Sequence, residues 1–411
     1  MSHLSLLFWQ RTLLCVSWLL AISWLWQVAD RWLHRHAVPD LHDLPLPPDQ
    51  TTAAPHLTVI VPACNEQDAI EATLRSLLAS RGLSLQILAV DDRSTDATGA
   101  RMDAVAAEWA AQRSAASQTQ SAPQHTLELL RIRSLPPGWL GKPHALAIAA
   151  EHARADWILF TDGDIEFSPD ALARAVAFAQ REQADHMVMI PDWIAVSRAE
   201  TALQGAMFAL TGCGLRYWKI ADPKARDFLG VGAFNLFRRK SYEALGGFAS
   251  LRMEVLEDVR IGWRVKQEGM RQRIAWGQGM VRVRWANGAW GVVRNLEKNI
   301  FALFRFRLLP ALAACAGLLL HTLLPLVAIV VGGSARPAGI LTYLALAAAY
   351  LLQQRRTRVP AAYVLFFPLA SVLFLVAMLR SISLTLARGG VLWRGTLYPL
   401  RELRAAAGRR W

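Results

Sequence analysis

Cysteine is scarce in this sequence, and the cysteines that are present are scattered. Cys15, Cys64, Cys213 and Cys315 include no C-x-x-C pair, which is the spacing typical of structural zinc sites and redox-active thiols. The sequence therefore favours neither a zinc site nor a disulfide framework. This cysteine usage is typical of a domain that works in a reducing compartment such as the cytosol.

Charged residues are also few, and their signs are unbalanced. Only 19% of the residues are charged whereas 54% are hydrophobic, which is too apolar for a purely soluble enzyme. The net charge of +13 suggests nucleic acid at first sight, but arginines gather beside apolar runs, as at Arg355, Arg356 and Arg358. This placement is typical of contact with anionic lipid. We expect a membrane as a partner and no nucleic acid.

Long uncharged runs are the most prominent feature of the chain. Four of them cover residues 12–28, 309–331, 337–352 and 361–379. Each is close to the length of about 20 residues that crosses a bilayer as a helix. The first run lacks a small-residue cleavage site and is followed by Arg31, Trp32 and His34, which favours an uncleaved anchor over a signal peptide. We predict about four transmembrane helices.

The segment between the first two runs has a different pattern. Residues 57–61 and 85–90 are compact β-rich runs, and apolar residues at helical spacing lie between them. Residues 127–132 and 157–161 repeat the strand pattern. Strands that alternate with amphipathic helices predict an α/β domain with a mostly parallel sheet.

These patterns predict five consecutive parts. They are an N-terminal transmembrane anchor at 1–30, an α/β domain at 55–286, an amphipathic interfacial helix at 287–308, three transmembrane helices within 309–380, and a basic C-terminal tail at 381–411. Three spans after a cytoplasmic domain place the arginine-rich tail on the opposite side of the membrane. Either the tail re-enters the interface, through residues 391–400, or one predicted span is wrong.

Polar motifs follow the first two predicted strands, where ligands bind in open α/β sheets. The first strand ends in Val61-Pro62-Ala63-Cys64-Asn65-Glu66 and the second in Val90-Asp91-Asp92-Arg93-Ser94-Thr95-Asp96. A carboxylate at the second strand end is well placed to accept hydrogen bonds from a base or a ribose. Capping of the next helix explains Ser94 without any ligand.

Two carboxylates follow a later strand as Asp162-Gly163-Asp164. The glycine between them lets the backbone approach a bound group closely. Such a pair suits Mg²⁺ or Mn²⁺, which bind oxygen ligands and share them with a diphosphate. An isolated D-x-D pattern also arises in surface turns, but its position after a buried strand favours a metal site.

A further acidic pair, Glu257-Asp258, follows the glycine-rich stretch Gly230-Val231-Gly232-Ala233-Phe234 at an expected helix start. Two interpretations stay open for it. The pair complements the helix dipole, or it supplies the general base that removes a proton from an acceptor hydroxyl during group transfer.

Taken in order, Cys64-Asn65-Glu66, Asp91-Asp92, Asp162-Gly163-Asp164 and Glu257-Asp258 resemble the signature of family 2 glycosyltransferases over roughly residues 57–285. Within that family, the segments at 138–145 and 295–299 look like those of the membrane-bound bacterial group that glycosylates carotenoid acids and hopanoid-type lipids, which is similar to the ceramide glucosyltransferases. The chain departs from the processive polysaccharide synthases and the ceramide glucosyltransferases in lacking a Q-x-x-R-W or R-x-x-R-W motif, since residues 301–307 read FALFRFR. This departure argues against polymer synthesis.

The resemblance implies a GT-A fold, a UDP-sugar donor, inversion at the anomeric carbon and a divalent cation, Mg²⁺ or Mn²⁺. It implies that Asp164 holds the metal with Asp162 nearby, that Asp92 contacts uridine, and that Asp258 is the base with Glu257 beside it. The donor site implied by the resemblance comprises Pro62, Cys64, Asn65, Glu66, Asp91, Asp92, Lys142 and Asp162. A snorkelling surface lysine is the alternative for Lys142.

The acceptor side is less defined. We assign Gly230, Gly232 and Arg238 to it, and two basic segments, at 238–240 and 393–396, are further candidates. Both segments are equally compatible with binding lipid headgroups.

Together these features predict an inverting glycosyltransferase that moves a sugar from a nucleotide diphosphate donor to a lipid acceptor. Its expected location is the cytoplasmic face of the cell inner membrane, in a multi-pass protein. The alternatives are a polyprenyl-phosphate sugar transferase, a polysaccharide synthase, or a catalytically silent scaffold that binds nucleotide sugars. The hypothesis requires the separate acidic motifs to converge on one cleft.

Overall fold

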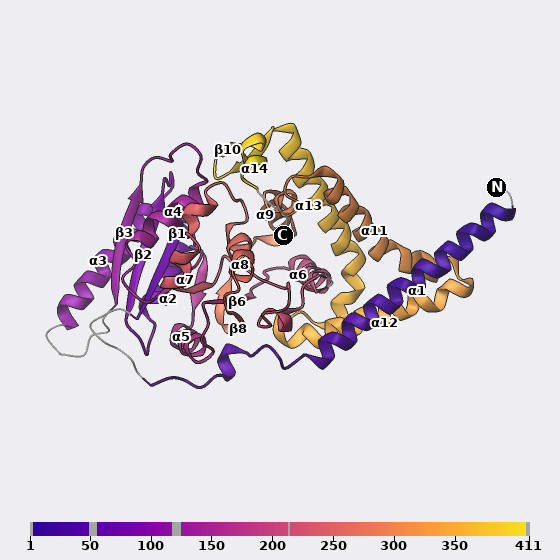
Figure 1. The fold of residues 1–411 in the computed structure, drawn as a ribbon, viewed down its shortest axis with the longest axis horizontal. Coiled ribbons are helices and arrows are strands. Elements are labelled where there is room, and N and C mark those ends of the chain that lie inside the picture. The colour runs from indigo at the N-terminus through magenta and orange to yellow at the C-terminus, as the bar shows by residue number, and fades with distance from the viewer. Residues whose placement is uncertain (1–2, 49–55, 117–124, 213, 408–411) are drawn as a thin grey trace. The chain divides into compact units, whose positions relative to one another are not determined.

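The computed structural model describes residues 3–48, 56–116, 125–212 and 214–407; Cys213 and the arginines at 409 and 410 lie outside these ranges. The chain forms two compact units (Figure 1). The sheet unit contains Val38–Ile194, Tyr217–Trp285 and Gly390–Trp411, and the helical unit contains Met1–Ala37, Ala195–Arg216 and Ala286–Gly389. This division differs from the consecutive parts expected from the sequence, because the chain leaves the sheet unit and returns to it.

An eight-stranded sheet forms the centre of the sheet unit, in the order β3-β2-β1-β4-β7-β6-β8-β5. Its strands are β1 (Leu57–Ala63), β2 (Leu85–Asp92), β3 (Thr126–Ile132), β4 (Trp157–Phe160), β5 (Ile165–Phe167), β6 (His186–Trp193), β7 (Asn235–Arg238) and β8 (Gln272–Val283). The half from β3 to β4 is parallel throughout. The mostly parallel α/β sheet predicted from the sequence is thereby confirmed.

Helices cover this sheet and supply the core. They are α2 (Ile70–Leu78), α3 (Thr98–Ala116), α4 (Gly141–Glu151), α5 (Ala171–Arg181), α7 (Arg239–Ala244) and α8 (Glu257–Gln267). β1 is buried along its whole length, as expected of a central strand covered on both faces. Aromatic rings of Phe160, Tyr242 and Phe248 pack together beneath α4 and the start of α8, with centroids 4.8–5.9 Å apart.

Strand direction determines which residues meet at the edge that carries the polar motifs. β1, β2 and β4 end there, because they are parallel and in register. β7 runs antiparallel to β4 and pairs Asn235 with Phe160. The glycine-rich segment before β7 therefore reaches this same edge from the opposite direction.

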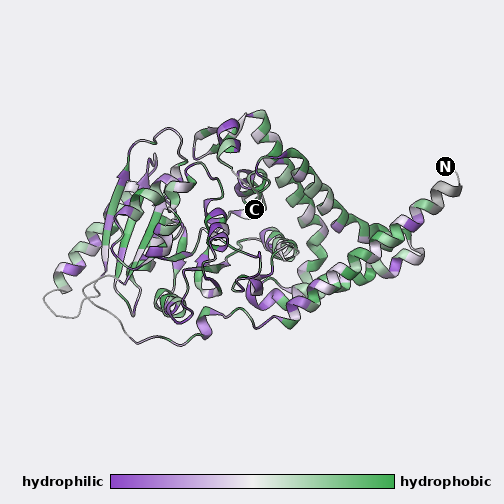
Figure 2. Ribbon diagram, in the orientation of Figure 1, coloured by the Kyte–Doolittle hydropathy of each residue, from purple (hydrophilic) through white to green (hydrophobic). Residues whose placement is uncertain are grey.

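The helical unit contains four helices long and apolar enough to cross a membrane, as predicted. They lie in α1 (His3–Leu33), α11 (Leu308–Val331), α12 (Arg336–Thr357) and the last stretch, Ala361–Ala387, which includes α13 (Phe367–Ala387). Figure 2 shows α11 and α13 coloured almost entirely as hydrophobic. The shorter helices of this unit are α6 (Arg198–Thr211), α9 (Gly288–Glu297) and α10 (Ile300–Leu303).

Two segments differ from their predicted form. The amphipathic helix expected at 287–308 is interrupted: α9 and α10 are separate, and Arg305 and Phe306 both adopt left-handed backbone with φ of 55°, which ends a right-handed helix. The basic tail expected at 381–411 begins inside α13. Beyond it, β9 (Gly390–Trp393) and β10 (Thr396–Pro399) form an antiparallel hairpin, followed by α14 (Leu400–Ala406).

Candidate active site

Lys142 is the centre of an acidic cluster at the sheet edge. Its Nζ lies 2.5 Å from Oδ1 of Asp162 and 2.8 Å from Oε1 of Glu257. Burial lowers the pKa of Lys142, but the carboxylates of Asp162, Glu257 and Asp258 outweigh burial and hold that pKa well above its ordinary value. Lys142 is therefore a fixed cation within a carboxylate cluster rather than a snorkelling surface lysine.

Asp258 sits in the first turn of α8, and two backbone amides orient its carboxylate. Oδ2 accepts a hydrogen bond from the Gly232 N–H at 2.8 Å, and Oδ1 accepts one from the Val259 N–H at 2.8 Å. Burial, together with the charge of Glu257, raises the pKa of Asp258 to about 6. A carboxyl group with a pKa in this range is a competent general base near neutral pH.

The glycines before β7 provide the room for this arrangement. A Cβ on Gly232 would lie 2.7 Å from Oδ2 of Asp162 and 3.2 Å from Nζ of Lys142, and a Cβ on Gly230 would overlap the backbone of Asp258. Both glycines therefore lie against the acidic cluster, where only a residue without a side chain fits. A small cavity beside it is lined by Lys142, Leu146, Phe160, Thr161, Gly232, Asn235, Phe248, Glu257 and Asp258.

Asp164 is the second carboxylate of the D-x-D turn, two residues after Asp162. Burial, together with the neighbouring charges of Asp162 and Glu66, raises its pKa to about 7. Among the residues that the structure describes, no three side chains form a ready set of metal ligands. Asp162 and Asp164 instead fit a cation that protein and substrate would bind together, because one or two carboxylates plus substrate phosphates are the usual ligands of Mg²⁺ at nucleotide sites. A cation there would offset the crowded negative charge.

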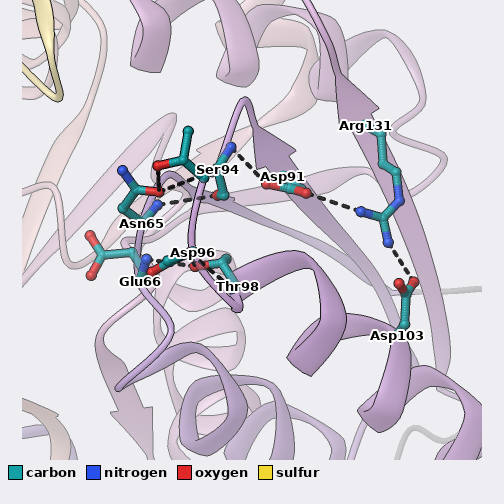
Figure 3. Close-up of polar contacts among 9 residues, drawn as sticks. Asn65, Glu66, Asp91, Ser94, Asp96, Thr98, Asp103 and Arg131 are labelled. Carbon is teal, nitrogen blue, oxygen red and sulfur yellow. Dashed lines mark hydrogen bonds and ion pairs between the residues drawn. The ribbon is translucent and has the colours of Figure 1, made fainter.

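The turn after β1 is held by hydroxyl and carboxylate groups that follow β2 (Figure 3). The Asn65 N–H donates to Oγ of Ser94 at 3.1 Å, and Oδ1 of Asn65 accepts from the Thr95 N–H at 2.8 Å. The Glu66 N–H donates to Oγ1 of Thr98 at 2.8 Å. These bonds stabilise Asn65 in left-handed backbone, with φ of 57°. Ser94 thus holds the first motif, and at the start of α3 it is Asp96 that accepts from the Thr98 N–H.

The two aspartates at the end of β2 have different partners. Asp91 accepts a hydrogen bond from Nη1 of Arg131 at 3.0 Å, and Arg131 also contacts Asp103 (Figure 3). Asp92 is buried and takes a bidentate contact from Arg93, at 2.7 and 3.0 Å. In this structure both oxygens of Asp92 are therefore engaged, so a nucleotide contact requires Arg93 to share or release them.

The C-terminal hairpin contributes two side chains to this edge. Nη1 of Arg394 donates to the backbone carbonyl of Asn65 at 3.2 Å, and Nη2 forms an ion pair with Glu66. The hydroxyl of the buried Tyr398 accepts a hydrogen bond from the Gly141 N–H at 3.2 Å. The sequence placed Arg394 among acceptor or headgroup contacts, whereas its partners belong to the first motif.

Arg238 lies at the opposite end of the sheet from the cluster. It pairs with Trp157 at the start of β4, and its guanidinium lies 5.0 Å from the centre of the Trp157 ring. The acceptor-side assignment of Arg238 is therefore not supported. β7 begins with Asn235 at the edge that carries the acidic cluster and runs away from it, so that Arg238 lies at the far end of the strand. The acidic motifs do converge in part: Lys142, Asp162, Glu257 and Asp258 meet, Asp164 neighbours Glu66, and Asp92 faces Arg93.

Sequence reasoning missed several contributors to this site. Arg93, Thr98 and Tyr398 carry no motif that separates them from ordinary turn, cap or hairpin residues. For Arg93 a weak signal existed, since a cation directly beside an acidic strand end is well placed to pair with it.

Known protein families and solved structures include proteins similar to this chain. The family described as glycosyl transferase family 2 matches residues 58–259, and the curated proteins include no match. Mannosyltransferase PcManGT from Pyrobaculum calidifontis, solved in complex with GDP-Man and Mn²⁺, is 18% identical, with a TM-score of 0.50 over 90% of this chain and 99% of that chain. S. aureus TarS 1–349 in complex with UDP-GlcNAc is 13% identical, with a TM-score of 0.35 over 83% of this chain and 95% of that chain.

The family match covers β1 through the start of α8, and so includes every acidic motif of the site. At its low identity, PcManGT establishes the fold alone, and its coverage extends past the sheet unit. Residues 58–259 are therefore a family 2 glycosyltransferase domain of the GT-A fold, and this chain is a glycosyltransferase.

Proposed function

We propose that this glycosyltransferase moves a sugar from a nucleotide diphosphate donor, UDP-linked, to a lipid acceptor, with inversion at the anomeric carbon. The observation that carries the proposal is the cluster of Lys142, Glu257 and Asp258 beside the D-x-D turn. It places a fixed cation, suited to a diphosphate, next to a carboxylate suited to remove a proton.

In the proposed reaction, Asp258 accepts the proton of an acceptor hydroxyl while that oxygen attacks the anomeric carbon. The bond from that carbon to the diphosphate breaks, and the nucleoside diphosphate leaves with both bonding electrons. Lys142 offsets the charge that develops on the departing group. Two amide donors orient Asp258 before substrate arrives, which lowers the cost of reorganisation in the transition state.

We assign Asp164 and Asp162 as the residues that would hold a divalent cation, Mg²⁺ or Mn²⁺. When bound, such a cation supplies electrostatic stabilisation of the leaving diphosphate. The charge crowding around Asp164 supports this assignment, and so does the Mn²⁺ complex of PcManGT. We expect chelation with EDTA to remove activity, and Mn²⁺ or Mg²⁺ to restore it. Unchanged turnover in EDTA would contradict the assignment.

The lipid acceptor is proposed from the helical unit. A chain with four apolar helices long enough to span a membrane keeps its catalytic domain close to lipid, where an acceptor of low water solubility is concentrated. Arginines at the end of α12 favour placing that end, and the domain with it, in the cytoplasm. For a bacterial protein, this means the cell inner membrane.

The position of the hairpin supports one answer to the conflict over membrane topology. Residues 390–407 are part of the sheet unit and bond to its other segments through Arg394 and Tyr398, which supports placing the hairpin and the domain on one side of the membrane. Three candidate spans separate Arg307 from Gly390, and an odd number of crossings would put these ends on opposite sides. We propose that α13 lies along the membrane surface, because besides the candidate span α11 it packs against α6, α9 and α10, which are not candidate spans.

Cysteine accessibility in membrane vesicles tests this topology. In a variant without native cysteines, Ser334→Cys, Pro360→Cys and Arg401→Cys are introduced one at a time and labelled with an impermeant thiol reagent. We expect residues 360 and 401 to label from one side and residue 334 from the other. Labelling of 360 and 401 from opposite sides would contradict a surface position for α13.

The function is tested with the purified chain in lipid nanodiscs. UDP-linked and GDP-linked sugars with a labelled glycosyl group are supplied with bacterial lipid extract, and products are identified by mass spectrometry. We expect label from a UDP-sugar in a lipid product whose anomeric configuration, measured by NMR, is opposite to that of the donor. Label in a soluble polymer, label on a polyprenyl phosphate, or retention of configuration would each overturn one part of the proposal.

A further inference from the structure

The hairpin of β9 and β10 has an unusual tip. Its strands are joined by Arg394 and Gly395, whose φ values of 49° and 78° both lie in the left-handed region. A two-residue turn of this kind matches the twist of a hairpin, but it favours asparagine or glycine at its first position. An arginine there is disfavoured by its backbone, so its presence is better explained by what its side chain contacts.

Arg394 contacts the motif that follows β1. Its guanidinium donates to the carbonyl of Asn65 and forms an ion pair with Glu66. Asn65 is itself in left-handed backbone. Burial raises the pKa of Glu66, and the charge of Arg394 works against that rise. The tip of the hairpin therefore stabilises both the shape and the charge of this turn.

Tyr398 makes a second contact, at the start of α4. Its buried hydroxyl accepts a hydrogen bond from the Gly141 N–H, one residue before Lys142. The space around Gly141 is closely filled, since a Cβ there would lie 2.5 Å from Nη2 of Arg93 and 2.6 Å from Oδ2 of Asp92. The hairpin therefore touches two of the segments that the proposed donor site requires, from residues more than 250 positions away in the sequence.

We propose that the C-terminal hairpin is part of the nucleotide-sugar site, and that Arg394 is a positioning residue for the donor. Arg394 holds the Asn65-Glu66 turn in the shape that accepts the nucleotide, and Tyr398 fixes the start of the helix that carries Lys142. This inference rests on the proposed nucleotide diphosphate donor. It assigns the basic tip to the donor side of the reaction rather than to lipid headgroups.

Titration of UDP in the presence of Mn²⁺ tests the assignment of Arg394, using the full chain in nanodiscs. The variants are Arg394→Gln, Arg394→Lys and, as a matched control, Arg401→Gln on the exposed face of α14. We expect Arg394→Gln to weaken UDP binding about tenfold and to raise the donor KM by a similar factor, with kcat changed less than about twofold. Arg394→Lys should recover part of the loss, and Arg401→Gln should behave like the parent.

The outcomes separate this inference from the function on which it rests. Parent protein that binds neither UDP nor GDP would overturn both. Parent protein that binds UDP, with Arg394→Gln binding it equally well or more tightly, would overturn the inference alone. Loss of binding to anionic vesicles with unchanged UDP affinity would assign the tip to headgroups instead and would equally overturn it.

Tyr398→Phe provides a second, independent variant. It keeps the buried ring and removes only the hydroxyl that accepts from Gly141. Because this contact precedes Lys142, we expect kcat to fall several-fold with a thermal midpoint close to that of the parent. A thermal midpoint well below the parent, with unchanged kcat in the folded fraction, would mean that Tyr398 serves only the packing of the hairpin.

Discussion

The two halves of the candidate site are built differently. Around Lys142, carboxylates are partly buried and balanced by a single ammonium group, and the pKa of Asp258 rises to about 6. Around Asn65 and Glu66, the turn is held by several neutral hydrogen bonds and one exposed arginine. In the proposed reaction, charge is therefore concentrated where bonds would break, whereas backbone shape is stabilised where a nucleotide would be held. Variants of the first half should reduce kcat, and variants of the second should raise the donor KM.

The largest expected effect is that of Asp258→Asn. Asparagine keeps an oxygen for one amide contact but removes the basic carboxylate, so we expect transfer to fall by about 10³-fold or more. UDP affinity, measured by titration calorimetry, should remain within a few-fold of the parent. The exposed Asp68→Asn is the control. Full activity in Asp258→Asn would force another residue to be assigned as the base.

Lys142→Met should cause the second-largest loss of turnover. Loss of the ammonium leaves Asp162 and Glu257 without their shared cation and removes charge stabilisation of the departing diphosphate. Loss of one such donor typically costs about 100-fold in turnover. The comparison variant is Lys224→Met, at an exposed lysine that is not assigned to any site. Steady-state kinetics with purified protein would contradict the assignment if both lysine variants were equally active.

The pH dependence of kcat/KM tests whether Asp258 is the base. Because the raised pKa of Asp258 lies at about 6, the base is ionised above that pH and protonated below it. We expect kcat/KM to decline about tenfold for each pH unit below 6. Removal of the Glu257 charge, in Glu257→Gln, should shift this decline to lower pH, since that charge raises the pKa. An acid limb that does not move would show that Glu257 does not influence the base.

The smallest effect is expected in the second half, for Thr98→Val. Valine removes the hydroxyl that accepts from the Glu66 N–H and donates to Asp96, at a cost of about 1 kcal/mol for a hydrogen bond. We expect a few-fold higher donor KM with little change in kcat. Thr201→Val, in which the lost hydroxyl donates to the carbonyl of Ser197 at the N-cap of α6, should leave both constants unchanged.

Local sequence was sufficient for many of the strands and for the long apolar helices. The runs at 57–61 and 85–90 become β1 and β2, and four long apolar helices are present as predicted. These features follow from periodicity and apolar length, which neighbouring residues alone determine.

The placement of several residues could not be predicted in this way. Arg238 appeared to belong with the glycine-rich stretch before it, but the direction of β7 carries it to the far end of the sheet. Segment Ala195–Arg216 lies within the expected domain range and yet belongs to the helical unit. Strand direction and unit membership depend on pairing between distant segments, which leaves no mark on local composition.

By itself, the sequence determined the chemistry available to this protein: acidic motifs after buried strands, a lysine as a candidate donor contact, and apolar helices before and after the domain along the chain. Only the tertiary structure decided the partners, pairing Lys142 with Glu257 and Arg394 with Glu66. The physical reason is that residue type sets which contacts are favourable, whereas the packing of distant segments sets which of them form.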